Sequence, residues 1–115
     1  MERYSSRIID EYGRISLHDE LRKKLNLETN TKVTLHPIGK IVILQKANTE
    51  NISQRYLIET IDESGNISLP EKLLKFMDWE TNDMVAVYHV DDNMLILKLI
   101  MWARTGASKV LECMR

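Results

Sequence analysis

The sequence predicts a small, mainly β protein with short helices, in which two copies of one unit interdigitate to close a small barrel. A shift of 52 residues aligns residues 3–33 with residues 55–85, and fifteen of these thirty-one positions are then identical. Each copy spans only about fifty residues, a size at which too little surface is buried for stability. The predicted strands are also too short to form a stable sheet within one copy. The two copies, or two chains, must therefore share one core.

Each copy is predicted to fold as strand, turn, strand, short helix and hairpin, because its apolar residues alternate in short runs. In the first copy we expect strands at residues 6–9, 14–17, 32–36 and 41–44. In the second copy we expect strands at residues 57–61, 66–69, 84–90 and 94–100. Between the second and third strand of each copy the apolar spacing lengthens to four residues, which predicts two-turn helices at residues 18–25 and 70–77.

Turn residues support these boundaries. Gly13 can take the positive φ that the turn after the first strand favours. Asn26 tolerates the left-handed conformation at a helix C-terminus. Pro70 suits the first helical position because its missing N–H would have no partner there. Residues 37–40 are expected to turn the chain within the first hairpin, and Trp79 is expected in the core.

The composition is typical of a soluble globular protein, with 43% hydrophobic and 29% charged residues. No apolar run is long enough to span a bilayer, and the N-terminus lacks the apolar segment of a secretory signal. Cys113 is the only cysteine. Because no disulfide can form within the chain, we expect a reducing, cytoplasmic location.

Charge distinguishes the two copies. Residues 1–50 carry nine Lys/Arg and seven Asp/Glu, whereas residues 51–98 carry four and nine. The chain is therefore divided into a basic first unit (residues 1–46), a linker (47–54), an acidic second unit (55–100) and a tail (101–115). Units that differ in charge but keep one core pattern are expected to have divided their surface roles.

Residues 7–27, RIIDEYGRISLHDELRKKLNL, resemble the signature of the AbrB/SpoVT/MazE/MraZ swapped-hairpin superfamily. The first unit matches that pattern over residues 7–46, with His18 where the family usually has proline, and the second unit matches it more weakly over residues 57–98. The resemblance implies a duplicated AbrB-like swapped-hairpin β-barrel, with the copies interdigitated as an intrachain pseudo-dimer. It further implies a prokaryotic DNA-binding transcriptional regulator or an antitoxin.

The resemblance also implies which residues face DNA. Carried over from the family, these are Arg7, Arg14, Arg22 and Lys23, with Lys24 and Arg3 as auxiliaries. Arginine suits this role because its guanidinium group makes bidentate contacts to phosphates and to guanine edges. The expected partner is double-stranded DNA, contacted at its backbone and groove by the arginines of the first unit, and the expected location is the nucleoid.

The second unit departs from the family at the same positions. Glu59, Asn66 and Leu74 replace the three arginines, and only Lys75 keeps its charge. DNA contacts are therefore assigned to the first unit alone. Because one chain then offers one basic unit, we expect a homodimer or higher homo-oligomer. A homodimer that pairs first unit with first unit stays open as an alternative to the within-chain barrel.

A second functional class is an antitoxin or protein-interaction module, which would bind a protein partner through the acidic second unit and the tail. The bland interpretation of the basic residues is a solvated surface. An enzyme is not expected, because Asp10 and Asp62 lie in turns where aspartate is favoured for backbone hydrogen bonds. The three histidines and Cys113 lack metal-ligand spacing, and no glycine-rich phosphate loop occurs. No cofactor, metal or membrane association is therefore expected.

Overall fold

The computed structural model describes residues 2–47, 57–91 and 94–101 of the 115-residue chain. The first unit contains β1 (Glu2–Ile8), β2 (Arg14–Ser16), α1 (Asp19–Lys24), β3 (Lys32–Ile38) and β4 (Ile41–Lys46). The second unit contains β5 (Leu57–Thr60), β6 (Asn66–Ser68), α2 (Glu71–Met77), β7 (Met84–Asp91) and β8 (Met94–Met101). The protein is therefore mainly β with two short helices among its described residues, as the sequence predicts. Nearly all of the predicted linker and tail lies outside the described residues.

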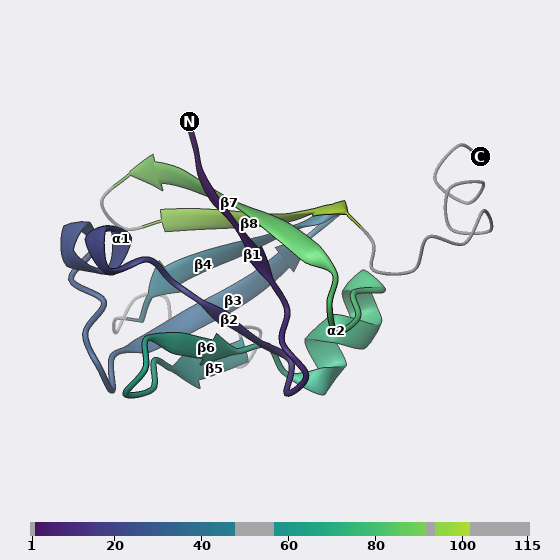
Figure 1. The fold of residues 1–115 in the computed structure, drawn as a ribbon, viewed down its shortest axis with the longest axis horizontal. Helices are drawn as coiled ribbons and strands as arrows, with labels where there is room; N and C mark the ends of the chain where they lie inside the picture. The colour runs from purple at the N-terminus through teal and green to yellow at the C-terminus, as the bar shows by residue number, and fades with distance from the viewer. Residues whose placement is uncertain (1, 48–56, 92–93, 102–115) are drawn as a thin grey trace.

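Strands of the two units are interleaved (Figure 1). A six-stranded sheet has the order β1-β7-β8-β4-β3-β5, and β2 pairs with β6 in a separate two-stranded ribbon, called the ribbon below. The β3–β4 hairpin therefore lies between β5 and β8 of the second unit. The β7–β8 hairpin likewise lies between β1 and β4 of the first unit. Each hairpin is thus flanked on both sides by strands of the other unit.

An approximate two-fold axis relates the two units. The pairing of β1 with β7 has its counterpart in the pairing of β5 with β3, and all of these pairs are antiparallel. The ribbon and the β4–β8 pair each join equivalent strands. Ile15 lies opposite Ile67 in the ribbon, and Ile43 lies opposite Ile96 in the β4–β8 pair. The axis therefore passes through the middle of both pairs.

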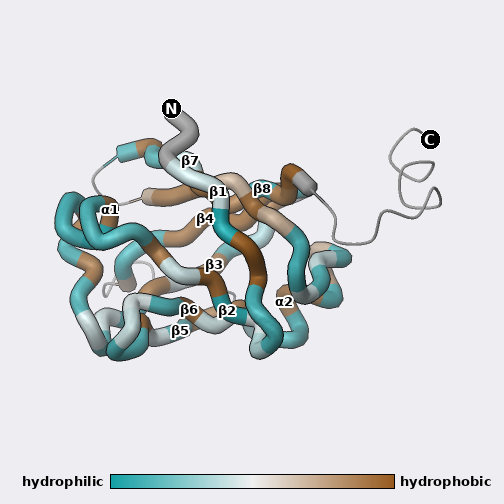
Figure 2. Tube along the Cα trace, viewed as in Figure 1, coloured by the Kyte–Doolittle hydropathy of each residue, from teal (hydrophilic) through white to brown (hydrophobic). Residues whose placement is uncertain are grey.

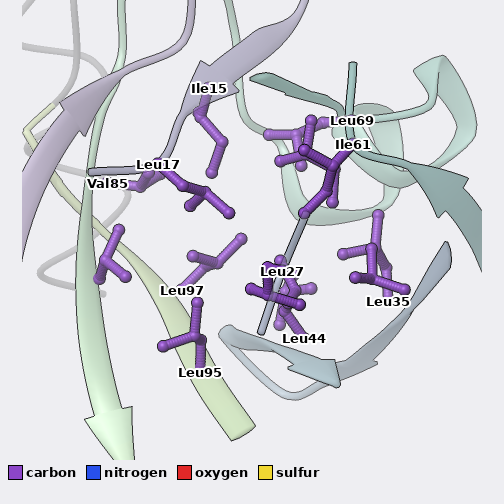
Figure 3. Packing of buried hydrophobic residues seen from close by; sticks show 14 of the residues in the cluster. Ile15, Leu17, Leu27, Leu35, Leu44, Ile61, Leu69, Val85, Leu95 and Leu97 are labelled. Carbon is purple, nitrogen blue, oxygen red and sulfur yellow. The ribbon is translucent and has the colours of Figure 1, made fainter. Parts of the chain in front are cut away.

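One hydrophobic core lies between the ribbon and the β4–β8 pair (Figure 3). Ile15 and Ile67 enter it from the ribbon, and Leu44 and Leu97 enter it from the opposite side. Both units contribute in this way, so neither could bury these side chains alone. Trp79, expected in the core, is buried there with 4% of its surface exposed.

Two element boundaries differ from the sequence-based expectation. β1 begins at Glu2 rather than at residue 6, because β7 provides ladder partners as far as His89. Pro70 does not start α2 but precedes it as the N-cap residue, with φ −58° and ψ 147°. This extended ψ is typical of an N-cap, and His18 has nearly the same angles before α1.

The turn expected at residues 37–40 is shorter than predicted. Pro37 and Ile38 belong to β3, and only Gly39 and Lys40 join it to β4. β5 pairs with β3 only as far as Leu35. Pro37 is tolerated because no hydrogen bond to β5 requires its missing N–H.

The helices end as their sequences predict. Asn26 follows α1 with a φ of +53°, and Asp78, its counterpart after α2, has a φ of +57°. Both adopt the left-handed conformation that ends many helices. Among the described residues, no helix is both long and apolar enough to cross a membrane.

Candidate nucleic-acid interface

The candidate site is the outer surface of the ribbon and the adjoining helix α1. In β2, Ile15 points into the core, so Arg14 and Ser16 lie on the outer side because side chains alternate along a strand. Asn66 and Ser68 of β6 lie opposite them. Figure 2 shows the hydrophilic turns that lead into both ribbon strands.

Arg7 reaches this surface from the neighbouring strand β1. Its Nε donates to the backbone carbonyl of Ser16 at 2.7 Å, and its Nη2 donates to the Ser16 hydroxyl. Its Nη1 lies 3.4 Å from Nε2 of His18. Three contacts therefore hold the half-buried Arg7 guanidinium against β2, close to the outer side that Arg14 occupies.

Arg14 lies between the carboxylates of two equivalent turns. Its Nε donates to Oδ2 of Asp10 at 3.0 Å, and its Nη1 lies 3.9 Å from Oδ2 of Asp62 in the other unit. Its Cζ lies 4.8 Å from the centroid of the Tyr12 ring, a distance at which a cation is attracted to the aromatic face. Two carboxylates thus offset much of the charge that Arg14 brings to the ribbon.

Both aspartates also organise their turns, as their sequence positions predict. Oδ1 of Asp10 accepts hydrogen bonds from the backbone N–H groups of Tyr12 (2.9 Å) and Arg14 (2.8 Å). Burial raises the pKa of Asp10, but these hydrogen bonds and Arg14 outweigh it and hold the pKa below its ordinary value. Oδ1 of Asp62 accepts equivalent bonds from Asn66 (2.9 Å) and Ser64 (2.8 Å), and the bond from Asn66 is the main cause of the lowered pKa of Asp62.

Arg22 is mainly a packing residue rather than an exposed arm. Its side chain is only 20% exposed, and its Nη2 pairs with Asp19 one turn earlier in α1. Its guanidinium lies against Gly65, where an added Cβ would lie 2.5 Å from Cζ of Arg22. Leu74, its counterpart in α2, packs in the same way against Gly13, with Cδ1 at 3.3 Å from such a Cβ. The structure therefore separates Arg22 from the ribbon arginines.

The two lysines of α1 are exposed. Lys23 lines an open hollow of about 350 Å³ beside the helix, together with Asp19, Arg22, Asn26, Leu27 and Glu28. This hollow carries both signs of charge. Lys24 is exposed on the same helix. The side chain of Arg3 lies outside the described part of the molecule.

The corresponding surface of the second unit carries no equivalent cations at three positions. Glu59 occupies the place of Arg7, and burial raises the pKa of its carboxyl group. Lys75 keeps its charge but pairs with Glu71 at 2.9 Å. Among the described residues, no group of three or more His, Cys, Asp or Glu could hold a metal ion.

Sequence reasoning missed three features of this surface. Ser16 and His18 hold Arg7, Asp62 reaches Arg14 across the units, and Gly65 receives Arg22. The repeat provided a signal for the last of these, because a leucine replaces the arginine at the equivalent position of α2. A residue that is interchangeable with leucine is expected to pack rather than to bind phosphate.

No protein-family model matches this chain, and a search of curated proteins finds no match. The solution structure of PHS018 from Pyrococcus horikoshii is similar to the chain at a TM-score of 0.49 and 17% sequence identity. That match covers 92% of this chain and 100% of PHS018. A similarity at this level supports no assignment of function.

Proposed function

We propose that this chain is a DNA-binding transcriptional regulator of the AbrB type that acts in the nucleoid. In this proposal its two units form a swapped-hairpin barrel within one chain, and the first unit faces DNA. The barrel is supported by the strand order, in which each hairpin lies between strands of the other unit. It is also supported by the core, to which equivalent residues of both units contribute.

The observation that carries the DNA-binding proposal is the convergence of two arginines at the ribbon. Arg7 is held at Ser16, and Arg14 lies two residues earlier on the same side of β2. Residues two apart in a strand are separated by about 6.8 Å, so the two guanidinium groups can follow successive phosphates. Arginine has five N–H donors. The contacts of Arg7 to Ser16 and His18 leave at least two of them for a phosphate.

Electrostatics predicts weak, salt-sensitive binding by a single chain. Arg14 is already offset by Asp10 and Asp62, so Arg7 and the α1 lysines supply most of the available positive charge. Glu59 and the acidic turns of the second unit repel phosphate on the other half of the ribbon. The first unit is therefore expected to approach DNA with α1, and the second unit to remain on the side away from it.

Duplex binding across a salt series tests this proposal. The logarithm of the binding constant should fall linearly with the logarithm of salt concentration, by about 0.9 for each phosphate neutralised. Arg7→Gln keeps a donor for Ser16 but removes the charge, and Lys23→Ala removes an exposed charge from α1. Each variant should reduce the slope by about one and weaken binding to all sequences.

Lys75→Ala is the matched control, because Lys75 occupies the position of Lys23 in the second unit. It should bind DNA as the wild type does. An equal loss of binding in Lys75→Ala would contradict the assignment of DNA to the first unit. If the wild type binds no duplex at about 20 mM salt, the basic residues form only a solvated surface.

A second candidate function is a protein-interaction module, favoured by one residue of α2. Phe76 is 70% exposed where α1 has Lys24, and α2 belongs to the acidic unit. An exposed aromatic with acidic surroundings suits a partner that offers an apolar pocket with a basic rim. Phe76→Ser should weaken capture of such a partner and leave DNA binding unchanged. Equal capture by the variant and the wild type would remove this candidate.

A further inference from the structure

The two central strands of the sheet are apolar on both faces. β4 reads IVILQK and β8 reads MLILKLIM, and Figure 2 shows most of β8 in the hydrophobic colour. Continuous apolar runs are typical of strands that are covered on both sides. The inner residues, such as Val42, Leu44 and Leu97, are buried in the core. The outer residues of the same strands have no described element over them.

Three rows of side chains cross this outer face, perpendicular to the strands. The central row is Tyr88, Ile96, Ile43 and His36. One flanking row is Ser6, Ala86, Lys98, Ile41 and Ile38, and the other is Met94, Gln45, Thr34 and Ile58. These thirteen residues, called the outer face below, include a single residue with a full charge, Lys98.

The outer face is only partly shielded by its own side chains. Ile38 is 48% exposed and Ile58 is 41% exposed at its ends, and the central Ile43 and Ile96 are half-buried. The approximate two-fold axis passes between Ile43 and Ile96. It exchanges the two flanking rows and maps the central row onto itself, so the face presents similar surfaces in two opposite orientations.

We propose that the outer face docks a second copy of this chain, with Ile43 and Ile96 at the centre of a symmetric interface. Strands lie about 4.8 Å apart and residues on one side of a strand about 6.8 Å apart. Six strands and three rows therefore span roughly 600 Å² in each copy. A dimer would bury about 1,200 Å² in total, which reaches the lower limit of stable protein interfaces.

A second copy fits this face better than a charged partner does. A symmetric interface requires that one surface be complementary to itself, and a nearly uncharged, β-branched face satisfies this requirement without opposing charges. Two such faces can pack at about 10 Å with interdigitating side chains, as stacked sheets do. This inference goes beyond the proposed DNA binding, because the ribbon lies on the opposite side of the core.

Sedimentation equilibrium of the full chain, without DNA, tests the proposal. The wild type should show twice the chain mass of 13.5 kDa at concentrations of tens of micromolar. Ile43→Lys and Ile96→Lys each place a charge at the centre of the interface. Each should raise the dissociation constant at least about tenfold, the size expected for a central anchor. Ile43→Thr, which suits a strand, should weaken the dimer while leaving the fold intact.

Phe76→Lys is the matched control, because it replaces a more exposed apolar residue that lies on α2, outside the outer face. It should leave the dimer unchanged. A wild type that stays monomeric at several hundred micromolar would overturn the proposal, because the face would then be uncovered or covered within the chain. A dimer that persists in both Ile43→Thr and Ile96→Lys would also overturn it, because the contact would lie elsewhere.

Discussion

Replacing Gly65 by alanine tests the packing of Arg22 between the units. Gly65 has a φ of +79°, where an L-residue is strained by about 1–2 kcal/mol. The added Cβ would also lie 2.5 Å from Cζ of Arg22 and 2.8 Å from its Nε, so the guanidinium must move. Losing its pair with Asp19 costs about 0.3–0.5 kcal/mol, and a strained side-chain torsion costs about 0.5–1.5 kcal/mol. We expect the free energy of unfolding to fall by about 2–4 kcal/mol.

Gly13→Ala separates the backbone strain from the contact with Arg22. Gly13 has a φ of +77°, but its Cβ would meet Leu74 Cδ1 at 3.3 Å and the Leu69 carbonyl at 3.5 Å. Its cost should therefore be mainly the backbone strain of about 1–2 kcal/mol. In a chain of this size each kcal/mol shifts Tm by roughly 3–6 °C. Gly65→Ala should lower Tm by at least about 3 °C more than Gly13→Ala does.

A double-mutant cycle by urea denaturation gives the decisive result. With Arg22→Ala already present, Gly65→Ala should cost only about 1–2 kcal/mol, so the two changes should couple by about 1 kcal/mol. Additive effects would refute the packing of Arg22 on Gly65. Equal destabilisation by Gly13→Ala and Gly65→Ala would refute it as well.

Three further substitutions probe the carboxylates. The pKa of Asp62 is lowered on folding, so its charge stabilises the fold above pH 3.8 and this contribution is lost as pH falls through the folded pKa; the stability deficit of Asp62→Asn at pH 7 should vanish near pH 2. The pKa of Glu59 is raised by burial, so Glu59→Gln should raise Tm at pH 7 but have no effect below about pH 4, and a lower Tm at pH 7 would contradict this. Asp83 is buried and accepts the Glu80 N–H at 2.8 Å, so Asp83→Ala should lower the free energy of unfolding by about 1–3 kcal/mol in urea. Thr31→Ala, at the equivalent position, is the control and should cost less.

Local chemistry made much of the fold predictable. Leu21 and Leu25 placed α1 within about one residue of its observed ends, because a four-residue spacing defines one helical face. Gly13 and Asn26 have the positive φ values that their turn positions require. Pro37 was placed wrongly in a turn, because its tolerance within β3 depends on where the neighbouring strand β5 stops. That fact belongs to tertiary structure and leaves no local pattern.

The candidate site was less predictable than the fold. A repeat alignment compares a residue with its counterpart, whereas packing depends on its neighbours in space. Arg14 meets Asp62 and Arg22 meets Gly65, and both contacts join the two units. The sequence therefore indicated which residues are basic but not that Arg14 is offset by two carboxylates. It also could not indicate that Arg7 would be fastened to Ser16 from a strand outside the ribbon.

The interleaved strand order has a consequence for how the chain folds. β1 finds its ladder partner only in β7, so residues 2–8 have no strand to pair with until residues 84–91 have been synthesised. The earliest hairpin available to the growing chain, β3 with β4, still lacks both of its outer neighbours at that stage. Closing such long loops has an entropic cost that must be met before the contacts form, which slows folding to milliseconds or longer. Completion of the sheet on the ribosome is thus tied to the emergence of the last strand.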